Sequence, residues 1–151
     1  MKTSLILVLV LFFGTASANN NEKIDKLAAP ILALFDKGEL DNIVTTALSK
    51  SSVADYLSKS DLQQTDSQFS GNFKIMGEFF GSDLLLQQGI EDVFITRWYL
   101  LRFKRQPVLL HMEFYKADKT WQVHSIQMDT SLDDYIENRG ELVLGEIDNL
   151  Q

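Results

Sequence analysis

The spacing of apolar residues divides the chain into a helical part and a strand part. Residues 79–129 are rich in β-branched and aromatic side chains, which favour strands. In residues 22–76 apolar side chains recur three or four positions apart, the period of an amphipathic helix. The first such series is Ile24, Leu27, Ile31, Leu34 and Phe35. The pattern predicts an α+β domain whose helices precede an antiparallel sheet.

Local signals in the helical part predict where the first two helices begin and end. Pro30 either kinks the first helix or marks the first turn of a helix that begins near Ala29. Gly38 follows the last apolar position and is expected to end this helix. The apolar series then resumes over residues 40–48, which predicts a second helix.

Two further helices are predicted from capping boxes, in which a short polar residue is followed three positions later by an acid or an amide. The first box begins at Ser52 and predicts a short helix. The second begins at Ser60 and opens a helix that carries Phe69, Phe73 and other apolar residues. This last helix is expected to stop at Gly71 or at Gly77.

Four strands are predicted in the second part of the chain. The three strong patterns are Val93–Arg105, Pro107–Lys116 and Thr120–Asp129, and Leu84–Gln88 is weaker. The separators are short, so neighbouring strands are expected to pair antiparallel. Two-residue loops at 105–106 and 117–118 would then set the register, with a one-residue bulge reversing it.

This register assigns each strand residue to one of two faces. His111 would face His124 across the sheet on the outer face. The inner face, against the helices, would carry Arg97, Tyr99, Leu101, Phe103, Leu110, Met112, Phe114, Trp121 and Val123. The outer face would carry Phe94, Thr96, Trp98, Leu100, Arg102, Leu109, His111, Glu113, Tyr115, His124, Ile126 and Met128.

The outer face is unusually apolar for a surface exposed to water. A contiguous apolar patch of this kind marks an interface, so the sequence predicts a symmetric homodimer packed sheet to sheet. The alternative is that the C-terminal segment folds back over the patch. The predicted interface residues are Trp98, Leu100, Leu109, His111, Glu113, Tyr115 and His124.

The first 18 residues have the three parts of a secretory signal peptide in the expected order. Lys2 supplies the positive charge, residues 5–13 form an apolar run, and Ala16-Ser17-Ala18 is a small-residue cleavage site. The run is too short to span a bilayer, which needs about 20 residues. An uncleaved N-terminal anchor is the alternative reading.

Removing these 18 of the 151 residues leaves a mature chain of 133, and the loss of Lys2 takes the net charge from −7 to −8. Such an acidic chain argues against a nucleic-acid partner, which would require a basic surface.

The chain has no Cys, which excludes disulfides and thiolate sites and suits a bacterial periplasm better than a small eukaryotic secreted domain. We therefore expect a soluble periplasmic protein of a Gram-negative bacterium, without a membrane span after cleavage. Its predicted parts are a single domain over 19–138, with a helical turn at 133–138, and an acidic, mobile tail over 139–151.

The stretches Trp98–Phe103, Glu113–Lys116 and Trp121–Val123, preceded by helices, resemble small exported bacterial proteins of the NTF2-like (cystatin-like α+β) superfamily. The resemblance covers residues 22–130. It implies a cone in which N-terminal helices pack on a curved four-stranded antiparallel sheet. The superfamily includes isomerases, dehydratases, polyketide cyclases and binding modules, so the fold alone assigns no activity. The Asp base and Tyr-containing oxyanion hole of ketosteroid-isomerase-like members do not align with residues of this chain, and none is carried over.

Arg97 is the one charge predicted on the inner face. With Tyr99 beside it, Arg97 could meet an anionic small-molecule ligand inside the cone. The alternative is an ion pair near the sheet end with Glu78, Glu91 or Asp92, because an unpaired buried Arg is costly.

His111, Glu113 and His124 are the other candidate cluster, and their side chains are of the types that bind Zn²⁺. An outward sheet face seldom supplies the second shell such a site requires, so a polar interface cluster is the preferred interpretation. Asp129, Asp133 and Asp134 could bind Ca²⁺, although Asp133 and Asp134 also suit a helix start. We expect no metal, no cofactor and no catalytic residue.

These observations predict an exported binding protein of unknown specificity. It would bind either a small molecule in the cone or a protein partner at the exposed sheet face. The alternatives are an isomerase- or lyase-like enzyme acting in the cone, which would need convergent titratable groups, and a structural interaction protein with a filled core.

Overall fold

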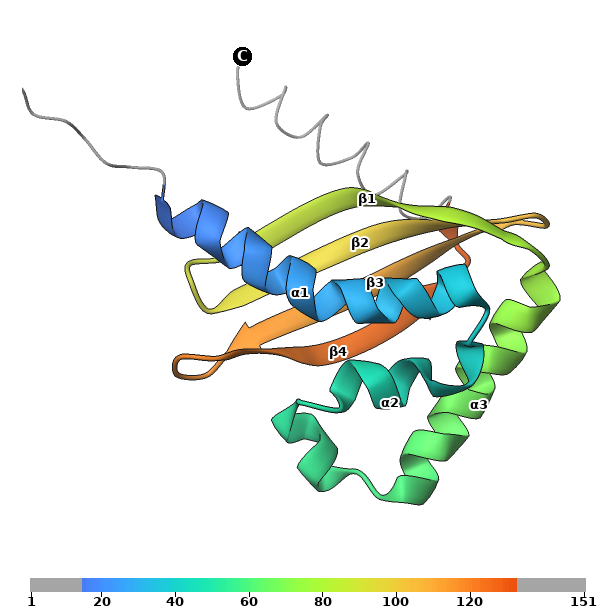
Figure 1. Cartoon of the computed structure of the whole chain (residues 1–151), viewed down its shortest axis with the longest axis horizontal. Helices are drawn as coiled ribbons and strands as arrows, with labels where there is room; N and C mark the ends of the chain where they lie inside the picture. Colours follow the sequence, from blue (N-terminus) through green and yellow to red (C-terminus); the bar gives the residue numbers. More distant parts are fainter. Residues whose placement is uncertain (1–14, 133–151) are drawn as a thin grey trace, which may run out of the picture.

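The computed structural model describes residues 15–132, and it confirms the predicted order of helices before strands (Figure 1). The predicted signal peptide before Thr15, the helical turn at 133–138 and the tail over 139–151 lie outside the described residues. The helical elements are α1 (Thr15–Lys37), η1 (Leu40–Asn42), α2 (Ile43–Leu48), η2 (Ser52–Tyr56) and α3 (Lys59–Met76), where η is a 3-10 helix. The strands are β1 (Phe79–Ile90), β2 (Phe94–Phe103), β3 (Pro107–Lys116) and β4 (Trp121–Asp129).

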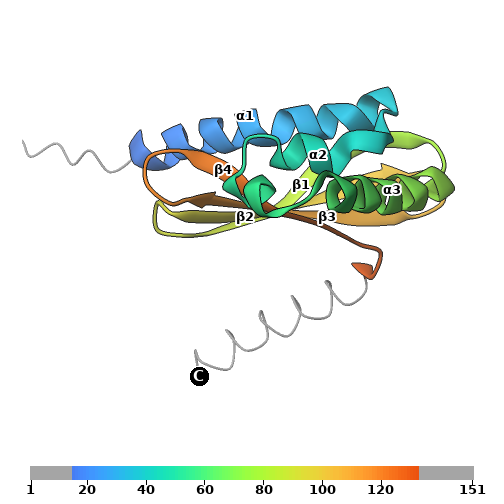
Figure 2. The same cartoon turned by 90° about the horizontal axis from the view of Figure 1, so that it is seen from below.

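The four strands form one antiparallel sheet in the order β1-β2-β3-β4. The sheet is curved and open, and among the described residues α1, α2 and α3 lie on the same one of its faces (Figure 2). The predicted fold class is therefore confirmed: N-terminal helices pack on a curved four-stranded antiparallel sheet. We call the helix-covered side the inner face and the opposite side the outer face.

The first helix runs through Pro30 instead of restarting there. α1 is a single helix from Thr15 to Lys37 with Pro30 inside it, and Pro30 is exposed. Ile24, Ile31 and Phe35 are each no more than 2% exposed, and the burial of this face outweighs the hydrogen bond that Pro cannot donate. The helix ends as predicted at Gly38, whose φ of 70° is the left-handed conformation that glycine adopts without strain.

The capping residues of η2 and α3 differ from the predicted ones. Ser51, one residue earlier than predicted, accepts the hydrogen bond from Val53 N at the start of η2. α3 begins with a reciprocal capping box between Ser58 and Asp61 instead of one that starts at Ser60. Both Ser58 and Ser60 satisfy the sequence pattern, and only the backbone geometry distinguishes them.

The short helix α2 is capped from outside by the carboxylate of Asp66 in α3. Asn42 precedes α2 without a side-chain capping bond. Asp66 accepts hydrogen bonds from Val44 N at 2.7 Å, from Thr45 N at 3.2 Å and from Thr45 Oγ1 at 2.5 Å. The carboxylate is 3% exposed, so the first turn of α2 and α3 are joined by a buried anionic cap.

Both predicted hairpin registers are wrong by two residues. The loops contain four residues, so that Arg102 pairs with Pro107 and Lys116 pairs with Trp121. A shift of two preserves the side on which each residue lies. The predicted inner face is therefore confirmed at alternate positions of β2, from Arg97 to Phe103, and of β3, from Leu110 to Phe114.

A β-bulge corrects the assignment of β4. The register shifts between Glu113 and Phe114, and an extra residue in one strand reverses the faces beyond it. Ile126 and Met128, predicted on the outer face, instead pack against the main core. His111 pairs with Gln127 and not with His124.

β1 is much longer than the predicted Leu84–Gln88. Its pairing with β2 is interrupted by two register shifts, between Phe79 and Gly81 and between Leu84 and Leu86. These bulges destroy the simple alternation of apolar and polar residues by which a strand is recognised.

Candidate functional site

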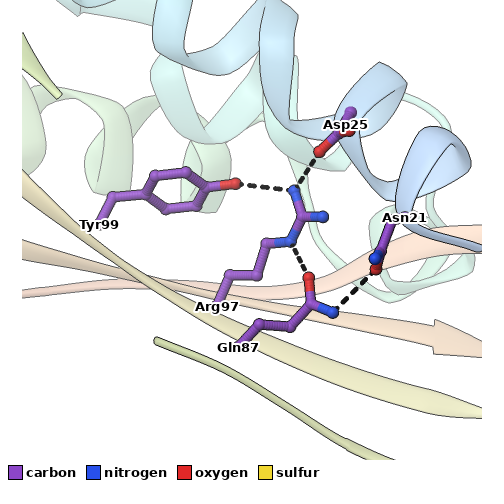
Figure 3. Close-up of polar contacts among 5 residues, drawn as sticks. All are labelled: Asn21, Asp25, Gln87, Arg97 and Tyr99. Carbon is purple, nitrogen blue, oxygen red and sulfur yellow. Dashed lines mark hydrogen bonds and ion pairs between the residues drawn. The ribbon is translucent and has the colours of Figure 1, made fainter. Parts of the chain in front are cut away.

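Arg97 is the centre of a polar cluster that joins the first helix to the sheet (Figure 3). Its Nη1 donates to Asp25 Oδ1 of α1 at 2.6 Å and to Tyr99 Oη at 3.1 Å. Its Nε donates to Gln87 Oε1 of β1 at 2.7 Å. Gln87 Nε2 in turn donates to Asn21 Oδ1 of α1 at 2.8 Å. The cluster therefore connects α1, β1 and β2 at one end of the sheet.

The electrostatics of this cluster favour a charged Arg97 and a neutral Tyr99. Burial opposes the charge on Arg97, but the hydrogen bonds to Tyr99 and Asp25 and the charge of Asp25 outweigh it and raise the pKa of Arg97. Burial also raises the pKa of Tyr99, and the bond from Arg97 offsets this only in part. Tyr99 therefore stays protonated at neutral pH and is a poor general base.

Arg97 forms an ion pair, but with a partner that differs from the predicted ones, and its predicted role in ligand binding stays a prediction. Arg97 is 3% exposed, and it pairs with Asp25 rather than with the predicted Glu78, Glu91 or Asp92. Asp25, Gln87 and Asn21 were not singled out from the sequence. Asp25 directly follows the buried Ile24 in α1, but the approach of this turn to β2 is a tertiary contact that no local pattern encodes.

The space between the helices and the inner face is filled by side chains. Phe35 and Phe73 from the helices meet edge to face at 4.9 Å between ring centroids, and Phe73 stacks on Phe103 of the sheet at 5.6 Å. Leu101, Leu110, Met112 and Phe114 beneath them are fully buried. The centre of the predicted cone is thus part of the hydrophobic core.

Apolar side chains lie on the outer face, and no helix of the described residues crosses this face (Figure 2). Phe94, Trp98 and Leu100 of β2 are only partly buried, and Ile90 and Tyr115 are 66% and 39% exposed. These side chains share the outer face because their backbone partners lie directly opposite. Arg102 and Asp83 form an exposed ion pair at one end, at 2.8 Å.

Among the predicted interface residues, Leu109 differs from the rest. It lies on the outer face, opposite Leu100, but is only 4% exposed. Its other neighbour is Asp129, the last residue of β4, after which the described chain leaves the sheet on the outer side (Figure 2). Leu109 therefore offers little surface to a partner.

The histidines of the outer face are each associated with an aromatic ring. The His111 ring stacks on Trp98, with centroids 4.3 Å apart and planes 15° apart, and its Nε2 contacts Thr96 Oγ1. His124 is exposed and meets Tyr115 edge to face at 6.0 Å. The predicted pairing of the two imidazoles is wrong, and the described residues contain no group of three or more His, Asp or Glu side chains arranged to hold a metal ion.

We expect His111 to make folding stability depend on pH. Burial lowers the pKa of His111 below its ordinary 6.5, against the opposing attraction of Glu113. The folded protein therefore binds this proton less readily than the unfolded chain does, so the stability that neutral His111 contributes is present above about pH 6.5 and is lost as pH falls through the lower folded pKa.

The measurement is the free energy of unfolding by urea between about pH 7 and pH 5, the range in which a histidine titrates. His111→Gln is expected to lose less stability over this range than the wild type. His124→Gln changes an exposed histidine on the same face and is the matched control. Equal pH slopes for the wild type and His111→Gln would contradict the prediction.

The fold and the two polar regions define an α+β protein with a filled core and a mixed outer sheet face. Comparisons with protein-family models, with curated proteins and with solved structures found no match to this chain. They give no support to the NTF2-like assignment, which stays a prediction. No helix in the described part of the chain combines the length and apolar character needed to cross a membrane.

Proposed function

We propose that this protein is an exported binding protein that works through its outer sheet face, and that a second copy of the chain is the partner on this face. The observation that carries the proposal is the partly exposed apolar series of β2, Phe94, Trp98 and Leu100, on the side of the sheet opposite the helices. Contiguous apolar surface of this kind is typical of a protein interface.

The size of the outer face suits a symmetric dimer. Four strands of nine to twelve residues, at about 3.3 Å per residue and about 4.8 Å per strand, cover on the order of 600 Å² before side-chain relief is added. A standard interface buries about 800 Å² on each partner. The flat area of the face is thus somewhat below this value, and the relief of its side chains brings it toward the size of a standard interface.

The charges at the two ends of the face favour an antiparallel pairing of two copies. Arg102, which also forms the exposed ion pair with Asp83, lies at one end of β2, and Glu113 lies opposite Thr96 near the other end. A two-fold axis between the sheets and perpendicular to the strands would bring the Arg102 end of one copy over the Glu113 end of the other. This is the self-complementary arrangement that an isologous interface requires.

An enzyme acting inside the cone receives less support. Such an enzyme needs at least two convergent titratable groups in a pocket. Of the inner-face candidates, Arg97 already donates hydrogen bonds to Tyr99 and to Asp25, and the middle of the inner face is packed with apolar side chains. Binding at the outer face remains the better proposal.

Trp98→Glu tests the proposed dimer. Placing a carboxylate at the centre of the apolar contact is expected to cost several kcal/mol because its desolvation is uncompensated, and the variant should be a monomer. The measurement is the solution mass by light scattering and by analytical ultracentrifugation. Tyr56→Glu is the matched control, because Tyr56 is 89% exposed in η2 in the helical layer, and it should leave the mass doubled.

Two outcomes would contradict the proposal. One is a monomeric wild type at all concentrations up to about 100 µM, far above the range of a specific interface. The other is a Trp98→Glu variant that keeps the doubled mass. A shortened chain that ends at Leu132 distinguishes a second copy from the C-terminal segment as the occupant of the outer face. If only this shortened chain dimerises, residues 133–151 and not a second copy occupy the face in the full protein.

A further inference from the structure

A polar cavity lies where the first described turns of α1 approach the β1–β2 hairpin. Its volume is about 370 Å³, at the lower end of the range of about 300–1,000 Å³ for ligand pockets. Its walls include Asn20, Asn21, Gln87, Glu91 and Asp92, with Gly89 and Ile95 as apolar positions. Gln87 pairs with Arg97 and Gly89 with Ile95, so the cavity opens on the inner side and is separate from the outer sheet face.

Arg97 fixes the orientation of the Gln87 amide in the cavity wall, and Figure 3 shows the contact between the two side chains. A guanidinium group can only donate hydrogen bonds, so Gln87 must present Oε1 to Arg97 Nε, at 2.7 Å. The amide nitrogen of Gln87 then points the other way and donates to Asn21 Oδ1 at 2.8 Å. The amide nitrogen of Asn21 forms no hydrogen bond with residues 20–132 and is left as a donor there.

Trp121 orients Asn20 in the same manner. An indole N–H can only donate, and Trp121 Nε1 donates to Asn20 Oδ1 at 3.4 Å. The Asn20 amide nitrogen is thereby directed to Asp92 Oδ1, while Lys116 Nζ binds the other oxygen of Asp92. Arg97 and Trp121 are only 3% and 5% exposed. Two buried donors thus hold the wall of the cavity in one arrangement before any ligand arrives.

We propose that this cavity binds a small, neutral, polyhydroxylated molecule such as a single sugar ring. The wall places amide N–H donors beside the carboxylate acceptors of Glu91 and Asp92, and a hydroxyl group both donates and accepts. An anion would be repelled by these carboxylates. Lys116 already offsets the charge of Asp92, which reduces the attraction for a cation. Ile95 and the bare backbone of Gly89 provide a surface for the C–H groups of a sugar ring.

Gly89 keeps that part of the wall open. A Cβ atom at this position would lie 3.1 Å from the backbone oxygen of Phe94 and 3.4 Å from Ile95 Cγ1. A side chain there would press against the hairpin backbone, so glycine suits this part of the wall.

The test is a titration of the isotope-labelled full-length protein, followed by the side-chain amide signals of Asn20, Asn21 and Gln87. The probes are methyl glucoside, methyl galactoside and N-acetylglucosamine, with acetate and putrescine as the anionic and cationic comparisons. At least one sugar is expected to shift these signals saturably, with a dissociation constant of about 1 mM. Saturable binding of acetate or putrescine without any sugar would overturn the proposed ligand class, and no saturable shift with any probe would overturn the site.

Gln87→Glu and Gln88→Glu form a matched pair of variants. Glutamate at position 87 still accepts from Arg97, so the fold is retained, but it cannot donate to Asn21 or to a ligand. Sugar binding is expected to weaken about tenfold or more. Gln88 is exposed and pairs with Thr96 on the outer face, so the same change there should leave the affinity unchanged. Equal affinities of the two variants would contradict the assigned role of Gln87.

Discussion

Replacing Arg97 by Leu is expected to lower the free energy of unfolding by about 2–4 kcal/mol. The substitution leaves the buried hydroxyl of Tyr99 and the Oε1 atom of Gln87 without the donor that they share. It also removes the ion pair to Asp25. The expected loss of unfolding free energy is smaller than for a fully buried ion pair, because the Asp25 side chain is 65% exposed and water can replace its partner. Urea unfolding followed by tryptophan fluorescence measures the change.

Arg102→Leu is the matched control for this prediction. Arg102 lies on the same strand and also pairs with an aspartate, Asp83, but both side chains are more than half exposed. Exposed ion pairs contribute about 0–1 kcal/mol, so this variant should be nearly as stable as the wild type. If Arg97→Leu were no less stable than Arg102→Leu, Arg97 would have to be held for a ligand and not for the fold.

A double substitution shows whether the loss comes from stranded partners. Tyr99→Phe removes the hydroxyl that Arg97→Leu leaves unsatisfied. Because removing both partners of a buried hydrogen bond costs less than removing one, the double variant is expected to be less destabilised than the sum of the single changes. A strictly additive result would mean that Tyr99 gains another donor, such as water, when Arg97 is absent.

The inner face was predictable from the sequence because successive side chains of a strand alternate between the two faces of the sheet. A register error of two residues therefore leaves every side chain on the face to which it was assigned. Both hairpins are out of register by two residues, yet Tyr99, Leu101 and Phe114 lie on the predicted side. The bulge at Glu113 and Phe114 adds a single residue, and this is the error that a period of two cannot absorb. Ile126 and Met128 were therefore assigned to the wrong face.

The candidate sites were less predictable because their members come from distant segments. The apolar character of Arg97's neighbours on β2 indicated a buried Arg that needs a partner, but nothing in the sequence pointed to Asp25, 72 residues away. Gln87 lies beyond the second bulge of β1, where the alternation of the strand had already failed. In both cases the missing information was the position of α1 on the sheet, which depends on the whole core.

Arg97 links the stability of the fold to the proposed sugar site on the inner side of the sheet. The same guanidinium that ties α1 to β2 through Asp25 also orients Gln87 in the cavity wall. Loss of Arg97 is therefore expected to affect both stability and sugar binding, whereas Gln87→Glu should affect binding alone. The outer face has its own residues and its own variant, Trp98→Glu, so the dimer and the cavity can fail independently.

Asp66→Ala is expected to lower the free energy of unfolding by about 3 kcal/mol, a fall of roughly 10 °C in Tm. Its carboxylate accepts from Val44 N, Thr45 N and Thr45 Oγ1 at a site that is 3% exposed. Alanine would leave these donors unsatisfied at the start of α2 and would remove a negative charge from the positive end of that helix. Thermal unfolding by circular dichroism gives the Tm, and urea unfolding gives the free energy.

Hydrogen exchange distinguishes a lost cap from general loosening. If Asp66 acts through α2, the amide protons of residues 43–48 should exchange faster in Asp66→Ala than in the wild type. The amide protons of β2 and β3 should keep their protection, after the change in global stability has been subtracted. Asp66→Asn keeps the shape and one acceptor and should fall between the wild type and Asp66→Ala. Asp118→Ala removes an exposed aspartate from the β3–β4 turn and should change neither measurement. Uniform loss of protection over the whole sheet would show that Asp66 supports the core rather than this one helix.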